Sequence, residues 1–193
     1  MPTGKRLGDW IQTSSGQVFY PLDPRPEEIH IEDIAHSLSM QCRFLGHCRD
    51  FYSVAEHSVR VARELPPELQ KWGLLHDAAE AYLGDMVRPL KYHSGAMGDL
   101  FRMYEAALMV AVCQAFELPI KEPAEVRRMD NVLLMTEKRD LVKMKPKPWE
   151  DTEQPLPGII DPWSPSYAKK EFLRTLTLIN HRESEIERAE IKR

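Results

Sequence analysis

The segment 53–67, SVAEHSVRVARELPP, decides the fold class because it contains a complete helix signal. Ser53 and Glu56 stand three residues apart, which is the capping-box pattern of a helix start. Residues of one helix face then recur at spacings of three and four: Val54, His57, Val61 and Leu65. The two prolines that follow end the pattern. We therefore predict a helix that has a histidine, His57, on its inward face.

The same period recurs along most of the chain and predicts a mostly helical fold. Helices are expected around Ile31–Leu38 and over 68–83, 98–117, 123–144 and 165–190. Gly84 is expected to end the second of these. Ser164 and Pro165 are expected to start the last one, Ser as cap and Pro at the first helical position. Residues 43–50 and 85–98 are expected to form loops.

The N-terminal arm, 1–28, differs from the rest. Two β-prone runs, 10–13 and 17–20, flank a turn with Gly16 and predict a small hairpin, which the prolines after it terminate. A proline-rich loop is expected over 145–165. The prediction is one domain over 1–193, an all-α bundle with a small N-terminal β-hairpin arm.

Composition narrows the function classes. The chain has 193 residues with 26 Lys and Arg against 30 Asp and Glu, a net charge of −4, which disfavours stable nucleic-acid binding. It contains no apolar run of about 20 residues, so no membrane span is expected. The N-terminus has no apolar signal core, and three cysteines make no disulfide framework. These features predict a cytoplasmic protein with reduced thiols.

Polar residues occupy three inward helix faces where apolar residues are expected: His57, His76 with Asp77 beside it, and Asp130. An unpaired buried carboxylate costs several kcal/mol, so it needs a partner. One divalent cation satisfies all four groups, and two His with two Asp suit Mn, Fe, Co, Ni or Zn. Two plainer explanations stay open: a hydrogen-bonded core histidine, and pairing of Asp130 with a nearby arginine.

The segment after His76 adds further charged groups. Glu80 stands four residues on, which places it on the same face of a continuous helix. Asp85 follows Gly84, and the cations Arg88 and Lys91 come next. Metal ligands, extra carboxylates and cations together are what phosphate-ester hydrolysis requires.

These residues resemble the HD-domain phosphohydrolases. The set His57, His76, Asp77 and Asp130, with flanks SVAEHS at 53–58 and LHDAAEAYLGD at 75–85, is similar to the HD-type 5′-deoxynucleotidases. The runs WIQT at 10–13 and FYPLDP at 19–24, with QCRF at 41–44 and RDFYS at 49–53, are similar to the small phage and bacterial dATP triphosphohydrolases. The resemblance covers residues 10–141.

The resemblance implies a role for ten residues. The metal ligands would be His57, His76, Asp77 and Asp130. Glu80 and Asp85 would assist the attacking water or hold a second metal. Arg43 and Lys91 would contact phosphate, and Phe44 and Pro89 would lie near the base or sugar. The implied cofactor is a divalent transition metal such as Zn, Co or Mn, and related enzymes are homo-oligomers.

The sequence therefore predicts a metal-dependent (deoxy)nucleotide phosphohydrolase, with a dATP triphosphohydrolase releasing deoxynucleoside and triphosphate as the first expectation. A 5′-deoxynucleotidase acting on monophosphates uses the same metal set and is the alternative. A second alternative is a non-catalytic module in which the metal only joins helices.

Overall fold

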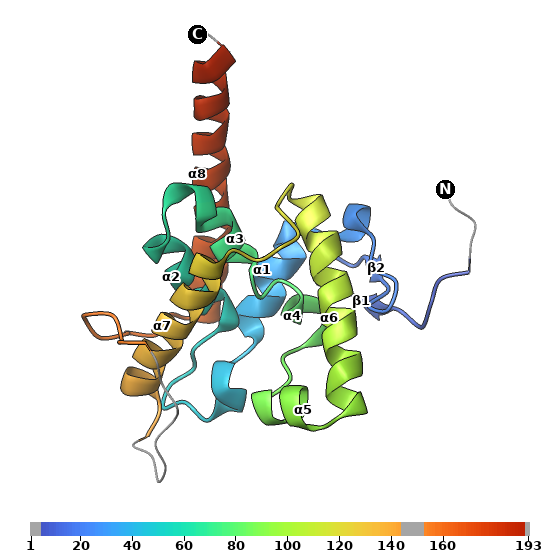
Figure 1. The fold of residues 1–193 in the computed structure, drawn as a ribbon, viewed down its shortest axis with the longest axis horizontal. Coiled ribbons are helices and arrows are strands. Elements are labelled where there is room, and N and C mark those ends of the chain that lie inside the picture. Colours follow the sequence, from blue (N-terminus) through green and yellow to red (C-terminus); the bar gives the residue numbers. More distant parts are fainter. Residues whose placement is uncertain (1–4, 144–152, 192–193) are drawn as a thin grey trace. The chain divides into compact units, whose positions relative to one another are not determined.

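Helices make up most of the described chain, and the all-α class with a small N-terminal hairpin is confirmed. The computed structural model describes residues 5–143 and 153–191 (Figure 1). The chain divides into two compact units. Unit 1 is Met1–Leu38 with Asp77–Lys121, and unit 2 is Ser39–His76 with Glu122–Arg193. We describe each unit by itself.

Unit 1 begins with the hairpin. Strand β1 (Ile11–Gln12) pairs antiparallel with β2 (Val18–Phe19), and Ile11 lies opposite Phe19. A short 3-10 helix, η1 (Pro26–Glu28), leads to α1 (Ile31–Met40), whose last two residues belong to unit 2. The hairpin turn is fixed to α1 because the backbone and hydroxyl of Ser15 donate to Asp33, both at 2.7 Å.

The second half of unit 1 is helical. Its helices are α4 (Glu80–Leu83), α5 (Arg88–His93) and α6 (Ala96–Ala115). The ring of Phe19 stacks on Tyr82 of α4 with 4.1 Å between centroids. Helix α5 packs on α6 at Gly98, where a Cβ atom would collide with the Lys91 carbonyl oxygen. Glycine is therefore required at that crossing.

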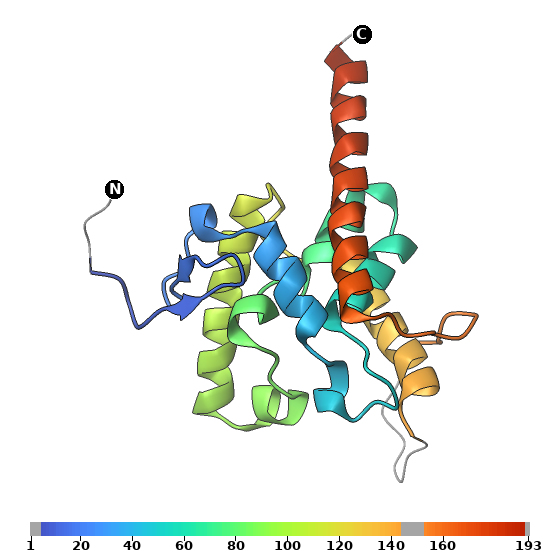
Figure 2. The same cartoon turned by 180° about the vertical axis from the view of Figure 1, so that it is seen from behind.

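Unit 2 is built around α2 (Val54–Glu64). It also contains η2 (Arg43–Gly46), η3 (Pro67–Leu69), α3 (Gln70–Leu75), α7 (Ala124–Leu141) and α8 (Pro165–Ile191). Helix α2 contacts α3, α7 and α8, and the two views show α8 alongside α2 and α3 with its C-terminal part extending beyond them (Figures 1 and 2). The core of the unit includes Val59, Leu74, Leu133 and Phe172.

Several expected helix boundaries are confirmed. Ser53 caps α2, because its hydroxyl accepts the Glu56 backbone N–H at 3.1 Å. Ser164 caps α8 in the same way, with the Tyr167 N–H at 3.3 Å. Gly84 ends α4 with φ +71°, a conformation that favours glycine. Helices α6 and α7 lie within two or three residues of their expected bounds.

Two expectations are wrong. The helix expected over 68–83 is broken into η3, α3 and α4, and the N–H groups of Glu80, Ala81 and Tyr82 bond to carbonyls three residues back. The loop expected over 85–98 contains α5, because Pro89 fits the first turn of a helix. Of the proline-rich loop expected over 145–165, residues 145–152 lie outside the described part, and 153–164 form neither helix nor strand.

Within residues 5–143 and 153–191, every helix is too short or too polar to cross a lipid bilayer.

Candidate metal centre

Three polar side chains of unit 2 converge from three elements. Nε2 of His57, on α2, lies 3.3 Å from Nε2 of His76, the residue after α3. Oδ1 of Asp130, on α7, lies 3.1 Å from Nε2 of His57 and 4.0 Å from Nε2 of His76. The three atoms lie within 4.8 Å of one another, so these residues could hold a metal ion. We call His57, His76 and Asp130 the metal group.

The local sequence explains the convergence. His57 lies on the face of α2 that contacts the other helices of the unit, and its side chain is 0% exposed. The side chain of Asp130 is 36% exposed, so solvent reaches one side of the group. A buried imidazole combined with an accessible carboxylate gives a site that is anchored in the core and open to a ligand.

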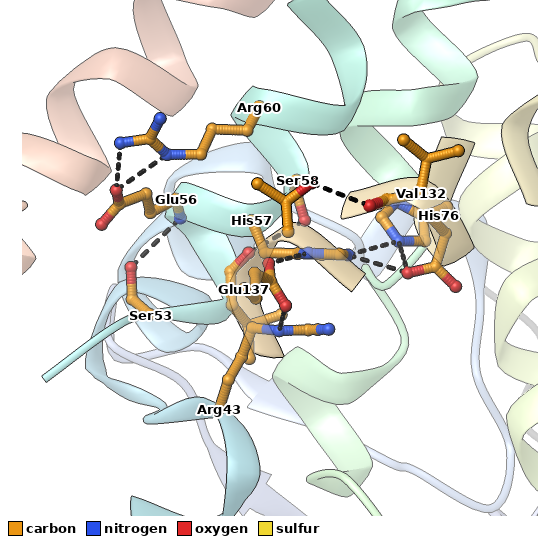
Figure 3. A network of polar contacts seen from close by, with 12 residues as sticks. Arg43, Ser53, Glu56, His57, Ser58, Arg60, His76, Val132 and Glu137 are labelled. Carbon is orange, nitrogen blue, oxygen red and sulfur yellow. Dashed lines mark hydrogen bonds and ion pairs between the residues drawn. The ribbon is translucent and has the colours of Figure 1, made fainter. Parts of the chain in front are cut away.

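Each histidine is held in one tautomer. Nδ1 of His57 lies 2.6 Å from Oε1 of Glu137 (Figure 3), and Nδ1 of His76 lies 2.7 Å from the carbonyl oxygen of Gly73. Because a carboxylate and a carbonyl only accept, both Nδ1 atoms donate, and in the neutral form of each ring Nε2 keeps a lone pair. This is the arrangement in which an outer hydrogen bond orients a metal-binding histidine.

The spacing fits a transition metal. Two lone pairs that face each other at 3.3 Å repel unless a cation or a proton lies between them. Two nitrogens on one tetrahedral zinc, with bonds of about 2.0–2.1 Å, lie about 3.3 Å apart. Imidazole and carboxylate donors suit Zn, Mn, Fe, Co and Ni. The residues present could therefore hold a metal ion.

A buried charge network supports His57 from behind. Glu137 is 0% exposed, and its Oε2 accepts from Nε of Arg43 at 3.1 Å. Burial acts to raise the pKa of Glu137, but the charges of Arg43 and His57 and the hydrogen bond from His57 lower it below its ordinary value. Burial and Arg43 act to lower the pKa of His57, and Glu137 and Asp130 raise it overall.

Arg43 belongs to a strained turn. Phe44 and Leu45 have φ of 56° and 52°, left-handed conformations that bulky residues seldom adopt. The turn is held at its base, where the Arg43 N–H donates to the Tyr52 carbonyl at 2.9 Å. The Phe44 ring lies under the Arg43 guanidinium at 5.7 Å. Arg43 and Phe44, two of the residues expected to contact substrate, thus lie together. Through Glu137, Arg43 is also connected to His57 of the metal group.

The remaining expected site residues belong to unit 1 and stay predictions. Asp77 directly follows His76 in the chain and is half-buried, and Glu80 begins α4. Asp85 is exposed just after Gly84. The i,i+4 argument that aligned Glu80 with His76 assumed one continuous helix and is wrong, because that helix is broken between them.

Pro89 and Lys91 lie on α5. Nζ of Lys91 donates to Oε1 of Glu105 at 2.6 Å. Burial acts to lower the pKa of Lys91, but Glu105 raises it overall, so the side chain stays charged. A phosphate contact by Lys91 would have to share the ammonium group with Glu105.

Sequence reasoning missed Glu137. The sequence pattern could have identified it, because Glu137 stands seven residues after Asp130. This spacing is two helix turns and puts both residues on the same face of α7, with buried Leu133 between them. A carboxylate at that position of an apolar stripe needs a partner in the core.

A second buried carboxylate, Glu56, belongs to the fold. Its Oε1 accepts from Nε of Arg60 at 2.9 Å (Figure 3), and its Oε2 accepts from the backbone N–H of Trp163 at 2.7 Å. Burial raises the pKa of Glu56 above its ordinary value. Glu56 therefore joins α2 to the segment before α8, in place of closing a capping box.

Comparison with known proteins gives two close relatives. The chain is 40% identical over 132 residues to the uncharacterized protein YfdR of Escherichia coli (strain K12), covering 68% of this chain and 72% of YfdR. It is 41% identical over 128 residues to the uncharacterized protein RCAP_rcc00048 of Rhodobacter capsulatus, covering 62% of this chain and 64% of that relative. The chain thus spans just under two thirds of the second relative's length. No family model matches the chain.

Proposed function

The chain belongs to the family of YfdR, and we propose that it is a metal-dependent phosphohydrolase of the HD type that acts on deoxynucleotides. The substrate we favour is dATP, hydrolysed to deoxyadenosine and triphosphate. Such an enzyme would work in the cytoplasm, where nucleotides are found.

The observation behind this proposal is the convergence of His57 Nε2, His76 Nε2 and Asp130 Oδ1, with both histidines held by outer hydrogen bonds. If His57 served only to pack the core, no second imidazole would be needed opposite its Nε2 lone pair. A partly exposed carboxylate at the same point leaves access for a substrate. The plainer explanation by pairing with a neighbouring arginine is less favoured, because Asp130 approaches His57 at 3.1 Å.

A bound divalent metal would supply Lewis-acid stabilisation of the phosphate and a water of lowered pKa. His57, His76 and Asp130 would hold it, and Asp77 is the expected fourth ligand. Glu137 and the Gly73 carbonyl hold the protons of the two imidazoles on Nδ1. Arg43 keeps Glu137 ionised through Nε and would hold a phosphate oxygen with its terminal amino groups.

The triphosphate substrate rests on the resemblance in residues 10–24 and 41–53, since the metal set alone serves triphosphates and monophosphates equally. The unit 1 residues Glu80, Asp85 and Lys91 would act on the attacking water and the phosphate, and Phe44 and Pro89 near the base or sugar. Zn, Co and Mn are the metals we would try first.

A turnover panel tests the proposal. The purified chain is incubated with each dNTP, NTP and dNMP in separate Mn, Co, Zn and Mg buffers, and the products are separated by ion exchange. Triphosphate release from dATP would support the proposal in full. Phosphate release from monophosphates alone would place the chain with the 5′-deoxynucleotidases. The matched control is Asp130→Asn, which keeps the size of the side chain and should abolish turnover; wild-type turnover in this variant, or no turnover in any metal, would contradict the proposal.

A further inference from the structure

Unit 2 contains a groove that shares no residue with the metal group. Its volume is about 480 Å³, within the range of small-molecule sites. One wall is a single face of α8, with residues at helical spacings of three and four: Tyr167, Glu171, Arg174, Leu178 and Arg182. The opposite wall includes Arg63 of α2 and Gln70 of α3.

The groove is strongly cationic. Glu171 is 4% exposed and accepts from Nη2 of Arg63 at 2.5 Å and from Nη1 of Arg174 at 3.4 Å. Arg182 donates to the neutral amide oxygen of Gln70 at 2.9 Å. Two guanidiniums thus share one carboxylate and the third pairs with a neutral amide, so the lining has a net charge of +2 in a chain whose net charge is −4. This local excess indicates an anionic ligand.

The length of the groove selects among anions. Arg174 and Arg182 are eight residues apart on one helix, which separates their backbones by about 12 Å along its axis. A single phosphate is short compared with this separation, whereas the several phosphate groups of an oligophosphate offer oxygens to more than one guanidinium of the lining. Tyr167, 45% exposed, supplies an aromatic face at the same wall. Trp163 meets its ring edge-on at 5.2 Å.

We propose that this groove binds a small oligophosphate anion: inorganic triphosphate or the triphosphate group of a nucleotide. Guanidiniums bind phosphate oxygens by paired, charge-assisted hydrogen bonds, which gives both affinity and orientation. The proposal stands whether or not the metal group is catalytic, because the two sites share no residue.

Calorimetric titration of the full chain tests the groove. Inorganic triphosphate, inorganic phosphate and dATP are titrated with and without a chelator, so that binding at the metal group is separated from binding at the groove. We expect chelator-resistant binding of triphosphate, weak or absent binding of single phosphate, and an affinity that falls as salt rises. Equal affinity for triphosphate and dATP would show that the groove recognises only the phosphate chain, so that the inorganic anion is a sufficient ligand. Tighter dATP binding that is lost in Tyr167→Ala would identify a nucleotide.

The variant Arg174→Gln/Arg182→Gln should weaken triphosphate binding about 100-fold, because two charge-assisted contacts are removed. Both side chains are exposed, and the circular dichroism of the variant should match that of the wild type. Arg188→Gln, exposed on the same helix outside the groove, is the control and should bind normally. The proposal would be overturned if neither inorganic triphosphate nor dATP binds in the presence of the chelator, or if Arg188→Gln loses as much affinity as the double variant.

Discussion

Glu137 accepts a hydrogen bond from His57, with 2.6 Å between Oε1 and Nδ1, and so decides which nitrogen of His57 faces the metal group. Glu137 and Asp130 are two turns apart on α7. One helix therefore supplies a candidate metal ligand and the residue that orients another ligand. Arg43 completes the arrangement by neutralising Glu137 in the core.

Glu137→Gln should weaken metal binding by about 10- to 100-fold, the usual effect of removing an outer partner of a metal-binding histidine. The amide keeps the shape of the side chain but neither the charge nor a fixed acceptor toward His57. Metal affinity is measured by competition with a chromogenic chelator. Glu125→Gln, exposed on the same helix, should bind metal normally. Unchanged affinity in Glu137→Gln would mean that the tautomer of His57 does not matter.

Arg43→Ala should lower the free energy of unfolding by about 3 kcal/mol, because it leaves the buried charge of Glu137 without its cation. Urea denaturation measures the loss. Arg49→Ala, an exposed arginine of the same loop, should lower it by less than about 0.5 kcal/mol. In the double variant Arg43→Ala/Glu137→Gln, the loss of unfolding free energy should be smaller than the sum of the losses in the two single variants. The reason is that the double variant no longer contains the buried charge of Glu137. Additive losses would show that the two residues act separately.

Asp77→Ala should remove both the metal and the activity while the helical content stays that of the wild type. The expectation comes from its place beside His76 and from the resemblance to HD enzymes. Metal content is measured by mass spectrometry and helical content by circular dichroism. Asp99→Ala, with a side chain 70% exposed in unit 1, is the control. Full metal content in Asp77→Ala would leave His57, His76 and Asp130 as the complete protein ligand set.

Helical periodicity and capping residues were enough to predict most of the fold. The bounds of α2 followed from Ser53 at one end and two prolines at the other, and the start of α8 followed from Ser164 and Pro165. The break between α3 and α4 could not be read in this way. Apolar residues continue through Leu74, Ala78 and Tyr82, and all three are buried, so the pattern looks continuous across the turn.

The sequence identified some residues of the candidate site and missed others, for a physical reason. A histidine or aspartate on an apolar face stands out because its burial is costly, and this identified His57 and Asp130. The partner that offsets such a cost comes from elsewhere in the chain. Glu137 is 80 residues from His57, and 94 residues from Arg43. Only the packing of α2, α7 and the 43–46 turn brings them together.

The hairpin of unit 1 should loosen in acid. Burial acts to raise the pKa of Asp33, but hydrogen bonds from Ser14, Ser15 and Thr13 lower it below its ordinary value of 3.8. A carboxyl whose folded pKa is depressed stabilises the fold above its unfolded pKa, and this stabilisation is lost as pH falls through the folded value. Hydrogen-exchange protection in residues 11–19 should therefore fall below about pH 3.8.

The control for this acid effect is Asp33→Asn. It should show reduced protection of the hairpin at neutral pH, by about 1–2 kcal/mol, and no further loss attributable to this position in acid. Protection in the wild type that is independent of pH below 5 would contradict the role of Asp33.

Oxidation should join Cys42 and Cys48, whose sulfurs lie 3.5 Å apart at the two ends of the turn that contains Arg43. Burial, with the neighbouring Cys42 thiol, raises the pKa of Cys48 to about 11, so few thiolates exist at neutral pH and slow reaction with air is expected. Diamide should complete the reaction: each thiol loses one hydrogen, a disulfide forms, and the azo group of diamide is reduced to a hydrazine. Bringing the sulfurs to about 2.05 Å would pull on the turn and on the contact between Arg43 and Glu137.

We expect oxidised protein to lose two hydrogen atoms in its intact mass, to bind metal more weakly, and to recover both properties with dithiothreitol. Cys48→Ser should show none of these changes, because one partner is missing. A disulfide that forms while metal affinity stays constant would show that the 43–46 turn does not control the metal group. If Cys48→Ser responds to diamide as the wild type does, the reactive thiol is Cys42 or Cys113, and the 3.5 Å approach has no chemical consequence.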